Sequence, residues 1–170
     1  MNTRDYSVNV LPVVEVSQTP EEKFREYLAS RPRRQRYTPQ RRDMVTYIFS
    51  KHNHFDADEL IDEMKGAGFR VSRATVYRTL DKLVDSGLLR RINLGTRTVY
   101  EHDYGYAQHD HLYCEQCSTM IEFQDAEIEK LIRDVCQQHQ FQFVGHSFII
   151  RGVCSNCNRA RMTKRRLDLV

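Results

Sequence analysis

The sequence predicts an α+β protein in which an N-terminal winged helix-turn-helix is followed by a smaller α/β domain around a structural four-cysteine zinc site. Three observations lead to this fold class. Capped, amphipathic helical segments fill the first half of the chain and end in a hairpin pattern, β-branched and aromatic segments follow, and two CxxC motifs bracket the second half. A chain of 170 residues has room for two small domains.

The composition is typical of a globular protein. Hydrophobic residues make up 40% of the chain and charged residues 29%, a balance that disordered and membrane proteins lack. No apolar run approaches the roughly 18 residues of a membrane span, and the first residues lack the layout of a signal peptide. We therefore expect a cytoplasmic protein with no membrane partner. In that reducing compartment, paired cysteines indicate metal binding rather than disulfides.

Four helices are predicted in the first half of the chain. A Ser, Thr or Asp that can accept hydrogen bonds from the first free backbone N–H groups stands at the start of each. Proline follows the cap in the first two helices, and glycines end the last two. The caps are Thr19, Thr38, Asp56 and Ser72, and the helices are expected from Pro20 to about Ser30, from Pro39 through Phe49, from Asp56 to Gly66 and from Ser72 to about Ser86.

The fourth helix has the character of a DNA recognition helix. Its apolar stripe, which begins at Val76, leaves the polar residues at its N-terminal end facing elsewhere. Two strands, Leu88–Ile92 and Thr96–Tyr100, then surround the turn Asn93–Gly95 and carry arginines, as the wing of a winged helix would. The candidate DNA contacts on the helix are Arg73, Thr75, Tyr77 and Arg78.

Charge supports the same interpretation through its distribution, because the net charge is only +3. Six arginines crowd residues 31–42, ahead of the second helix. A solvated basic linker or an ordinary small α+β core are the alternatives. DNA binding is favoured because the basic run, the exposed start of the fourth helix and the basic wing occur together.

A second domain is predicted from Tyr104. Strands are expected at 112–114 and 120–123, a helix over 125–139 and a long apolar strand over 141–152. Cys136 extends the apolar stripe of that helix, so we expect it to be buried. A small sheet with one helix makes a weak monomer, and its apolar surplus and open sheet edge favour a homodimer.

Two CxxC motifs carry the strongest metal signal. Four thiolates at this spacing can close a tetrahedron around Zn²⁺ and leave no position open, which makes the predicted site structural. Redox-active cysteine pairs and coincidental core cysteines are the alternatives. The predicted zinc ligands are Cys114, Cys117, Cys154 and Cys157.

A second metal signal precedes the first CxxC motif. His109, Asp110 and His111 alternate along an extended segment, so the histidines and the aspartate face opposite sides and can serve two sites. Nitrogen and oxygen donors suit Fe²⁺, Mn²⁺, Co²⁺ or Zn²⁺ and bind them more exchangeably than four thiolates do. Such a site is suited to sensing.

These motifs together resemble the ferric uptake regulator family of bacterial repressors. The resemblance covers about residues 24–157 and rests on His-Asp-His-Leu-Tyr-Cys-x-x-Cys from His109, Ile-Glu-Phe from Ile121, His146-Ser, the second CxxC motif, and Arg-Ala-Thr-Val-Tyr-Arg over 73–78. It implies a winged helix joined to a dimerisation domain, with metal binding favouring a closed dimer on palindromic operator DNA.

The resemblance also implies roles for individual residues. The regulatory metal site would comprise His54, Glu101, His109 and His111, with Glu122 as a possible further ligand. A secondary site would comprise Asp110, Glu129 and His146; Gln108 stands where relatives often have histidine, so we expect partial occupancy at best. Tyr77 and Arg78 match the recognition helix, and Arg36 matches a basic residue that reaches the minor groove.

The sensed metal is predicted from few residues. Peroxide-sensing relatives have Asp where Glu101 and Glu122 stand, and zinc-sensing relatives commonly have a cysteine in the sensor shell. We therefore expect an Fe²⁺-sensing repressor of iron-acquisition genes rather than a peroxide-, zinc- or manganese-sensing member. The alternatives outside the family are a zinc-stapled metalloenzyme and a protein-binding adaptor.

The expected organisation of the chain follows from these assignments. It comprises a flexible arm over 1–19, a DNA-binding domain over 20–103, a metal-binding dimerisation domain over 104–160 and a basic tail over 161–170.

Overall fold

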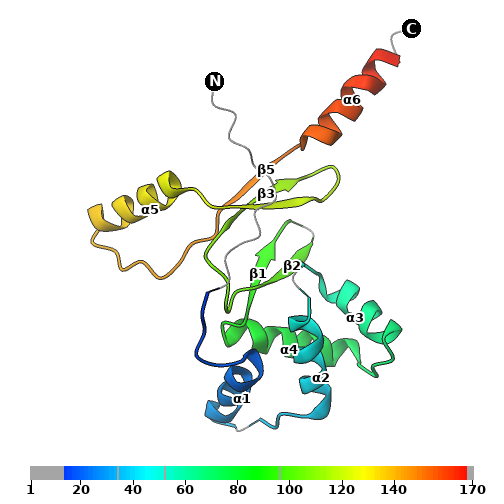
Figure 1. The fold of residues 1–170 in the computed structure, drawn as a ribbon, viewed down its shortest axis with the longest axis vertical. Helices are drawn as coiled ribbons and strands as arrows, with labels where there is room; N and C mark the ends of the chain where they lie inside the picture. The colour runs from blue at the N-terminus through cyan, green and yellow to red at the C-terminus, as the bar shows by residue number, and fades with distance from the viewer. Residues whose placement is uncertain (1–13, 34, 52, 96, 168–170) are drawn as a thin grey trace. The chain divides into compact units, whose positions relative to one another are not determined.

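The computed structural model describes residues 14–33, 35–51, 53–95 and 97–167, with side chains of the last helix described as far as residue 161. These residues form two compact units that divide between Ala107 and Gln108 (Figure 1). We refer to them as the winged-helix unit and the C-terminal unit. The predicted domain limits remain predictions, and the predicted N-terminal arm lies largely outside the described residues.

The winged-helix unit contains the four predicted helices. They are α1 (Pro20–Ser30), α2 (Pro39–Phe49), α3 (Ala57–Gly66) and α4 (Arg73–Asp85), and each begins immediately after its predicted cap. Thr19 shows why these starts are well defined: its hydroxyl accepts the N–H of Glu22 at 3.2 Å, and the Glu22 carboxylate accepts the N–H of Thr19 at 2.8 Å. Such a reciprocal capping box satisfies two backbone donors that the helix itself leaves free.

The wing is a hairpin of β1 (Leu89–Asn93) and β2 (Thr98–His102). The predicted second strand was placed two residues too early, and the predicted turn Asn93–Gly95 is wrong. Asn93 pairs with Thr98, and the Leu94 N–H donates to the Arg97 carbonyl at 2.8 Å, so Asn93 belongs to the first strand and not to the turn. The predicted first residue of the second strand, Thr96, lies outside the described residues. Gly95, with a φ of 84°, supplies the left-handed conformation of this turn.

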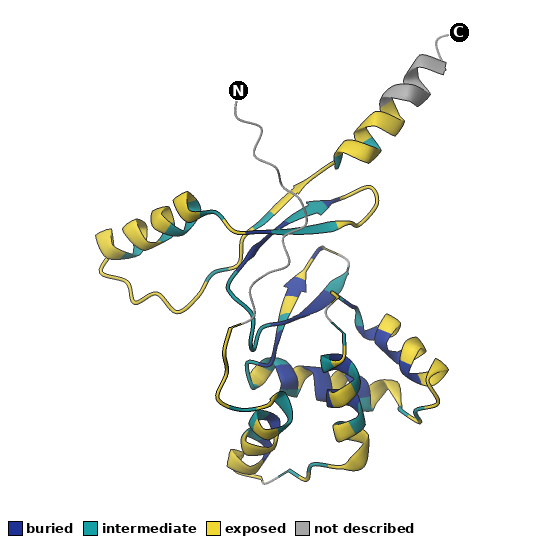
Figure 2. Cartoon of the chain, viewed as in Figure 1, coloured by how far each residue is buried: buried dark blue, intermediate teal, exposed yellow. Residues whose placement is uncertain are grey.

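The core of the winged-helix unit lies where its four helices meet the first wing strand. Phe24, Met44, Ile61 and Leu80 contribute one side chain from each helix and have no exposed surface. In Figure 2 the buried residues gather on the inner faces of these helices. The polar start of α4 therefore lies on a firmly packed element, and its side chains remain available at the surface.

The C-terminal unit is a three-stranded sheet with two helices. The strands β3 (Asp110–Cys114), β4 (Met120–Phe123) and β5 (Ile149–Gly152) lie in the order β4-β3-β5, antiparallel for the first pair and parallel for the second. The helices are α5 (Ala126–Gln138) and α6 (Ser155–Leu167). The first two strands and α5 confirm their predictions. No helix had been predicted in place of α6, where the sequence indicated a basic tail.

The predicted strand over 141–152 is wrong for most of its length. The parallel register pairs His111 with Ile149, and the Phe148 carbonyl accepts the His111 N–H at 3.1 Å. The pairing with β3 begins only there, and residues 141–148 are not part of a strand. An apolar sequence alone therefore does not make a strand here. Phe141, Val144 and Phe148 are exposed.

The apolar face of α5 is also exposed. Leu131 is 62% and Val135 46% exposed, and α5 contains no buried residue (Figure 2). Cys136, predicted to be buried, is only half-buried for the same reason. Among the residues that the structure describes, no helix has both the length and the apolarity needed to cross a membrane.

Candidate metal centres and nucleic-acid interface

The four cysteines of the CxxC motifs come together at one end of the C-terminal sheet. Cys114 ends β3, and its pairing with Gly152 places the second motif beside the first. The four sulfur atoms all lie within 4.8 Å of one another, with 3.7 Å between the sulfurs of Cys117 and Cys154. No cysteine forms a disulfide. The donor set fits one tetrahedral Zn²⁺.

The thiols of this cluster differ in acidity. The backbone N–H groups of Cys154 and then Cys117 donate to Cys114 and lower its pKa to about 6. Thr119, with its hydroxyl 3.1 Å from the sulfur, lowers the pKa of Cys117. Interactions with Cys117 and then Cys154 raise the pKa of Cys157 to about 12. Crowded thiols resist the loss of the last proton unless a cation balances the charge, which is the role that zinc would have here.

Imidazole and carboxylate donors form a second cluster in the C-terminal unit. His109 precedes β3, His111 lies on it, and Glu122 faces His111 from β4 in the antiparallel register. Their donor atoms lie within 4.8 Å of one another, and the two imidazole rings are 4.9 Å apart. This set of nitrogen and oxygen donors suits Fe²⁺, Mn²⁺, Co²⁺ or Zn²⁺.

The winged-helix unit positions the two remaining residues predicted for the regulatory site. His54 is followed by Phe55, whose backbone forms a β-bridge with Tyr100. This bridge places His54 beside β2. His54 Nε2 lies 3.0 Å from Glu101 Oε2, and Arg90 Nη1 lies 3.6 Å from the other carboxylate oxygen. Within its own unit, Glu101 is buried and holds the imidazole of His54 in place.

The residues predicted for the secondary site are only partly brought together. Asp110 and His146 are side by side, with 3.0 Å between Oδ1 and Nε2. The side-chain amide of Gln108 donates a hydrogen bond to the carbonyl of His146 at 3.2 Å. Glu129 instead contacts Arg133 at 3.4 Å. Within the described residues, neither cluster of metal-binding side chains includes these four.

The start of α4 presents the predicted DNA contacts. Arg73, Tyr77 and Arg78 are exposed and Thr75 is half-buried. Asp58 of α3 accepts hydrogen bonds from Arg73 at 2.6 Å and from the Tyr77 hydroxyl at 3.3 Å, a link that the sequence did not reveal.

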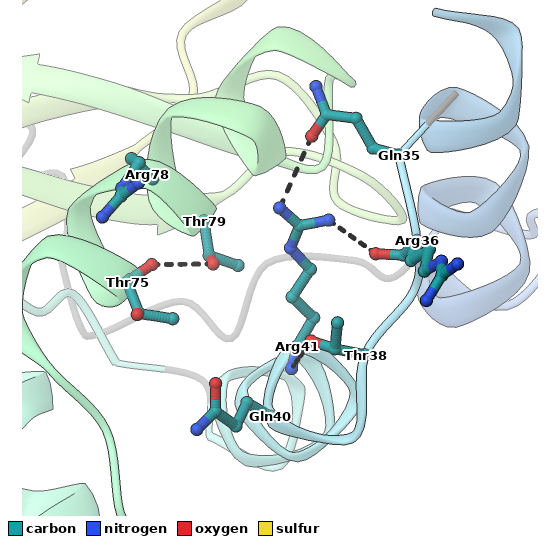
Figure 3. Close-up of a pocket in the computed structure, with 8 residues that line it drawn as sticks. All are labelled: Gln35, Arg36, Thr38, Gln40, Arg41, Thr75, Arg78 and Thr79. Carbon is teal, nitrogen blue, oxygen red and sulfur yellow. Dashed lines mark hydrogen bonds between the residues drawn. The ribbon is translucent and has the colours of Figure 1, made fainter. Parts of the chain in front are cut away.

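Arg36 and Arg78 line one hollow of about 410 Å³, together with Arg41 (Figure 3). Arg41 was not predicted as a functional residue. The helical period places it on a different face of α2 from its neighbour Arg42, and this signal could have separated the two within the basic run.

A winged helix with exposed polar residues at the start of α4, in a chain that also carries a thiolate cluster and an imidazole–carboxylate cluster, defines a metal-dependent DNA-binding regulator. The family model described as "Ferric uptake regulator family" matches residues 33–151. The chain belongs to this family, and it is a transcriptional regulator rather than an enzyme or a protein-binding adaptor.

Individual relatives support this assignment. The ferric uptake regulation protein of Campylobacter jejuni subsp. jejuni is 30% identical over 128 residues, which cover 74% of this chain and 82% of that protein. The peroxide-responsive repressor PerR of Staphylococcus aureus is 30% identical over 122 residues, covering 72% and 82%. The iron-containing ferric uptake regulator structure from Francisella tularensis superposes with a TM-score of 0.66 at 25% identity, covering 75% of this chain and 98% of that one.

Proposed function

We propose that this protein is a cytoplasmic, Fe²⁺-responsive repressor that binds palindromic operator DNA as a homodimer. The observation that carries the proposal is the division of nitrogen and oxygen donors between the two units: His54 and Glu101 in one, His109, His111 and Glu122 in the other. A divalent ion bound by donors from both units would supply the charge that holds them together. The Francisella tularensis relative is described with iron, which supports this choice of metal.

In this proposal His54 is the ligand that links metal to DNA binding. It lies just ahead of the α3 cap, and α3 contacts the recognition helix through Asp58. A shift from a mostly open to a mostly closed protein requires about 10⁴-fold tighter metal binding in the closed state. Ligands contributed by the winged-helix unit provide that difference, because opening would remove them from the metal.

The four cysteines have a separate role in the proposal. They hold a structural Zn²⁺ that fastens β3 to the start of α6, and they take no part in sensing. Apparent binding free energies of structural zinc are on the order of 10 kcal/mol, comparable to the whole stability of a small domain. The secondary residues Asp110, Glu129, His146 and Gln108 remain a proposed, partially occupied site.

The homodimer is supported by the surface that the single chain leaves uncovered. The apolar face of α5 and the apolar residues of segment 141–148 are exposed, and an apolar surface of this kind is typical of an interface. A second copy of the chain offers the same surface and can cover it by two-fold symmetry. The dimer would present two recognition helices to the two halves of a palindromic operator.

The test is the substitution His54→Ala, with His139→Ala as a matched control. His139 is an exposed histidine at the end of α5 and is not among the predicted ligands. Operator binding is measured without oxygen, with and without Fe²⁺ or Mn²⁺, together with zinc content and sedimentation. We expect His54→Ala to abolish the metal response while the dimer and its zinc persist. An unchanged metal response in His54→Ala would overturn the proposed mechanism.

A peroxide-sensing function is the second candidate because of the similarity to the Staphylococcus aureus repressor. The two glutamates Glu101 and Glu122 favour iron sensing over it, as the family pattern implies. Brief treatment of the Fe²⁺-loaded protein with hydrogen peroxide separates the two. Irreversible loss of operator binding, with oxidised histidine found by mass spectrometry, would indicate a peroxide sensor.

A further inference from the structure

The hollow beside the recognition helix has the lining of an anion site. Its walls are the loop and helix start carrying Gln35, Arg36 and Arg41 on one side and Thr75, Arg78 and Thr79 of α4 on the other. Figure 3 shows the side chain of Arg41 extending from α2 into this space, towards the segment with Gln35 and Arg36. Its lining combines three guanidinium groups with hydroxyl and amide groups and includes no carboxylate.

The arginines of the hollow differ from several other arginines of the winged-helix unit. Four of these pair with acids: Arg73 with Asp58, Arg90 with Glu101 and Asp103, Arg91 with Asp81, and Arg97 with Asp56 and Glu59. Within the described part of the chain, Arg36, Arg41 and Arg78 form no ion pair with a carboxylate. Their charge is therefore left for an anion from outside the chain.

Neutral groups hold Arg41 in place. Its Nη1 donates to the Arg36 carbonyl at 2.6 Å and its Nη2 to Gln35 Oε1 at 3.4 Å, and the Gln35 N–H donates to the Leu28 carbonyl at 3.1 Å. These contacts fix the guanidinium without cancelling its charge. The neighbouring Lys82 has a lowered pKa, first through burial and then through repulsion by Arg41, which is consistent with a positive local field.

The place of the hollow in the fold suggests its ligand. In a duplex, each sugar–phosphate strand runs between the major groove and the adjacent minor groove. The recognition helix α4 forms one wall of the hollow, and the segment with Arg36, the predicted minor-groove residue, forms the other. A strand that separates the two grooves would therefore pass over the hollow.

We propose that this hollow seats one backbone phosphate of the operator duplex, with Arg41 as the side chain that binds it and Arg36 and Arg78 flanking it. The inference rests on the proposed DNA binding and adds a residue to it. Arg41 would set the register between the helix and the minor-groove segment, because it contacts the segment and the phosphate at once. Phosphate contacts of this kind position a protein on DNA without reading its sequence.

The experiment compares Arg41→Gln with Arg42→Gln in the full-length, metal-loaded protein. Arg42 is the matched control because it lies next in sequence, is exposed, does not line the hollow and contacts Asp43. Operator affinity is measured over a range of salt concentrations. Loss of one phosphate contact should make the slope of log K against log salt shallower by about 0.9 and weaken binding about tenfold. Arg42→Gln should have much the smaller effect, and equal effects would overturn the proposal.

A second arm starts from the unmodified protein, so its first result does not depend on how well a variant folds. The affinity of the unmodified protein is measured for a set of operators, each of which has an uncharged methylphosphonate in place of one backbone phosphate. We expect the modification to weaken binding at one position in each half-site, both for the unmodified protein and for Arg41→Lys. Arg41→Gln has already lost this contact, so the same modification should not weaken its binding further. A merely structural role for Arg41 would lower affinity at every position alike, and that result would overturn the inference.

Free inorganic phosphate is the other anion that the hollow could bind through the same arginines. Inorganic phosphate is titrated into the DNA-free protein while the arginine side-chain resonances are followed by NMR. Saturable binding that Arg41→Gln abolishes, combined with a flat methylphosphonate scan, would assign the hollow to a free anion and overturn the duplex assignment. If the unmodified protein binds no duplex, the proposed function fails as well. If it binds duplex DNA in a metal-dependent way but no phosphate position depends on Arg41, only the present inference fails.

Discussion

Replacing Leu131 by alanine on α5 should weaken the homodimer without unfolding the helix. Leu131 is 62% exposed in the single chain, and full burial of a leucine side chain contributes about 1.5–3 kcal/mol. Covering the exposed part would contribute about 1–2 kcal/mol per copy, and two-fold symmetry doubles this to about 2–4 kcal/mol. At about 1.4 kcal/mol per factor of ten, the dimer dissociation constant should rise about 30-fold to 1,000-fold.

Sedimentation equilibrium of the zinc-loaded protein across a concentration series measures this change. Alanine is the strongest helix former, so α5 should persist, and circular dichroism checks that it does. Lys130→Ala is the control, because Lys130 is an exposed neighbour whose side chain is not part of the apolar stripe. A Leu131→Ala protein that dimerises as tightly as the Lys130→Ala protein would refute the assignment of α5 to the interface.

Three further predictions concern stability. Cys114→Ser should release zinc and unfold or monomerise the C-terminal unit, as metal analysis and sedimentation would show; a stable zinc-free dimer would contradict the proposed structural role. Leu80→Ala should lower the free energy of unfolding by about 2–5 kcal/mol, because it leaves a cavity among fully buried side chains, and guanidinium titration measures the loss. Ser72→Ala should cost about 1 kcal/mol in the same assay, since the Ser72 hydroxyl accepts the Thr75 N–H at 3.2 Å, whereas an equally stable variant would show that water replaces the cap.

The helices of the winged-helix unit could be predicted from the sequence because their signals are local. Thr38 shows this clearly: the cap, the following proline and the apolar period all lie within a dozen residues of one another. The wing was predicted less accurately, because Gly95 marks a turn but does not fix which residues pair across it. That register depends on the contact between Asn93 and Thr98.

The C-terminal unit shows where local patterns fail. Residues 141–148 are apolar enough to suggest a strand, yet the pairing with β3 begins only at the end of this segment, and the strand is confined to Ile149–Gly152. Apolar residues at an interface have the same pattern as core residues, so the sequence indicated an apolar surplus in this domain but not that the exposed part of it lies on α5. The cysteine cluster was predictable because the CxxC spacing itself carries the chemistry.

The sequence indicated only some of the contacts that the proposed nucleic-acid face makes within the chain. Arg73 and Tyr77 were predicted as DNA contacts from their place at the start of α4, but their shared acceptor Asp58 lies on another helix and has no sequence signal. Arg41 was one of six arginines in a basic run, and charge alone could not distinguish it. The role proposed for Arg41 depends on its having neutral hydrogen-bond partners, Arg36 and Gln35, and no carboxylate partner in the described chain, and the fold determines which groups lie beside it.

The parallel pairing of β3 with β5 has a consequence for the order in which the protein can fold during its synthesis on the ribosome. The winged-helix unit is complete once Ala107 has been made, so it can fold while synthesis continues. The C-terminal sheet has to wait, because β3 gains its central position only when β5 has emerged, and the first CxxC pair gains its partners only with Cys154 and Cys157. The winged-helix unit can thus form before the cysteine cluster is complete, and all four thiolates can hold the proposed zinc ion only after Cys157 has been made.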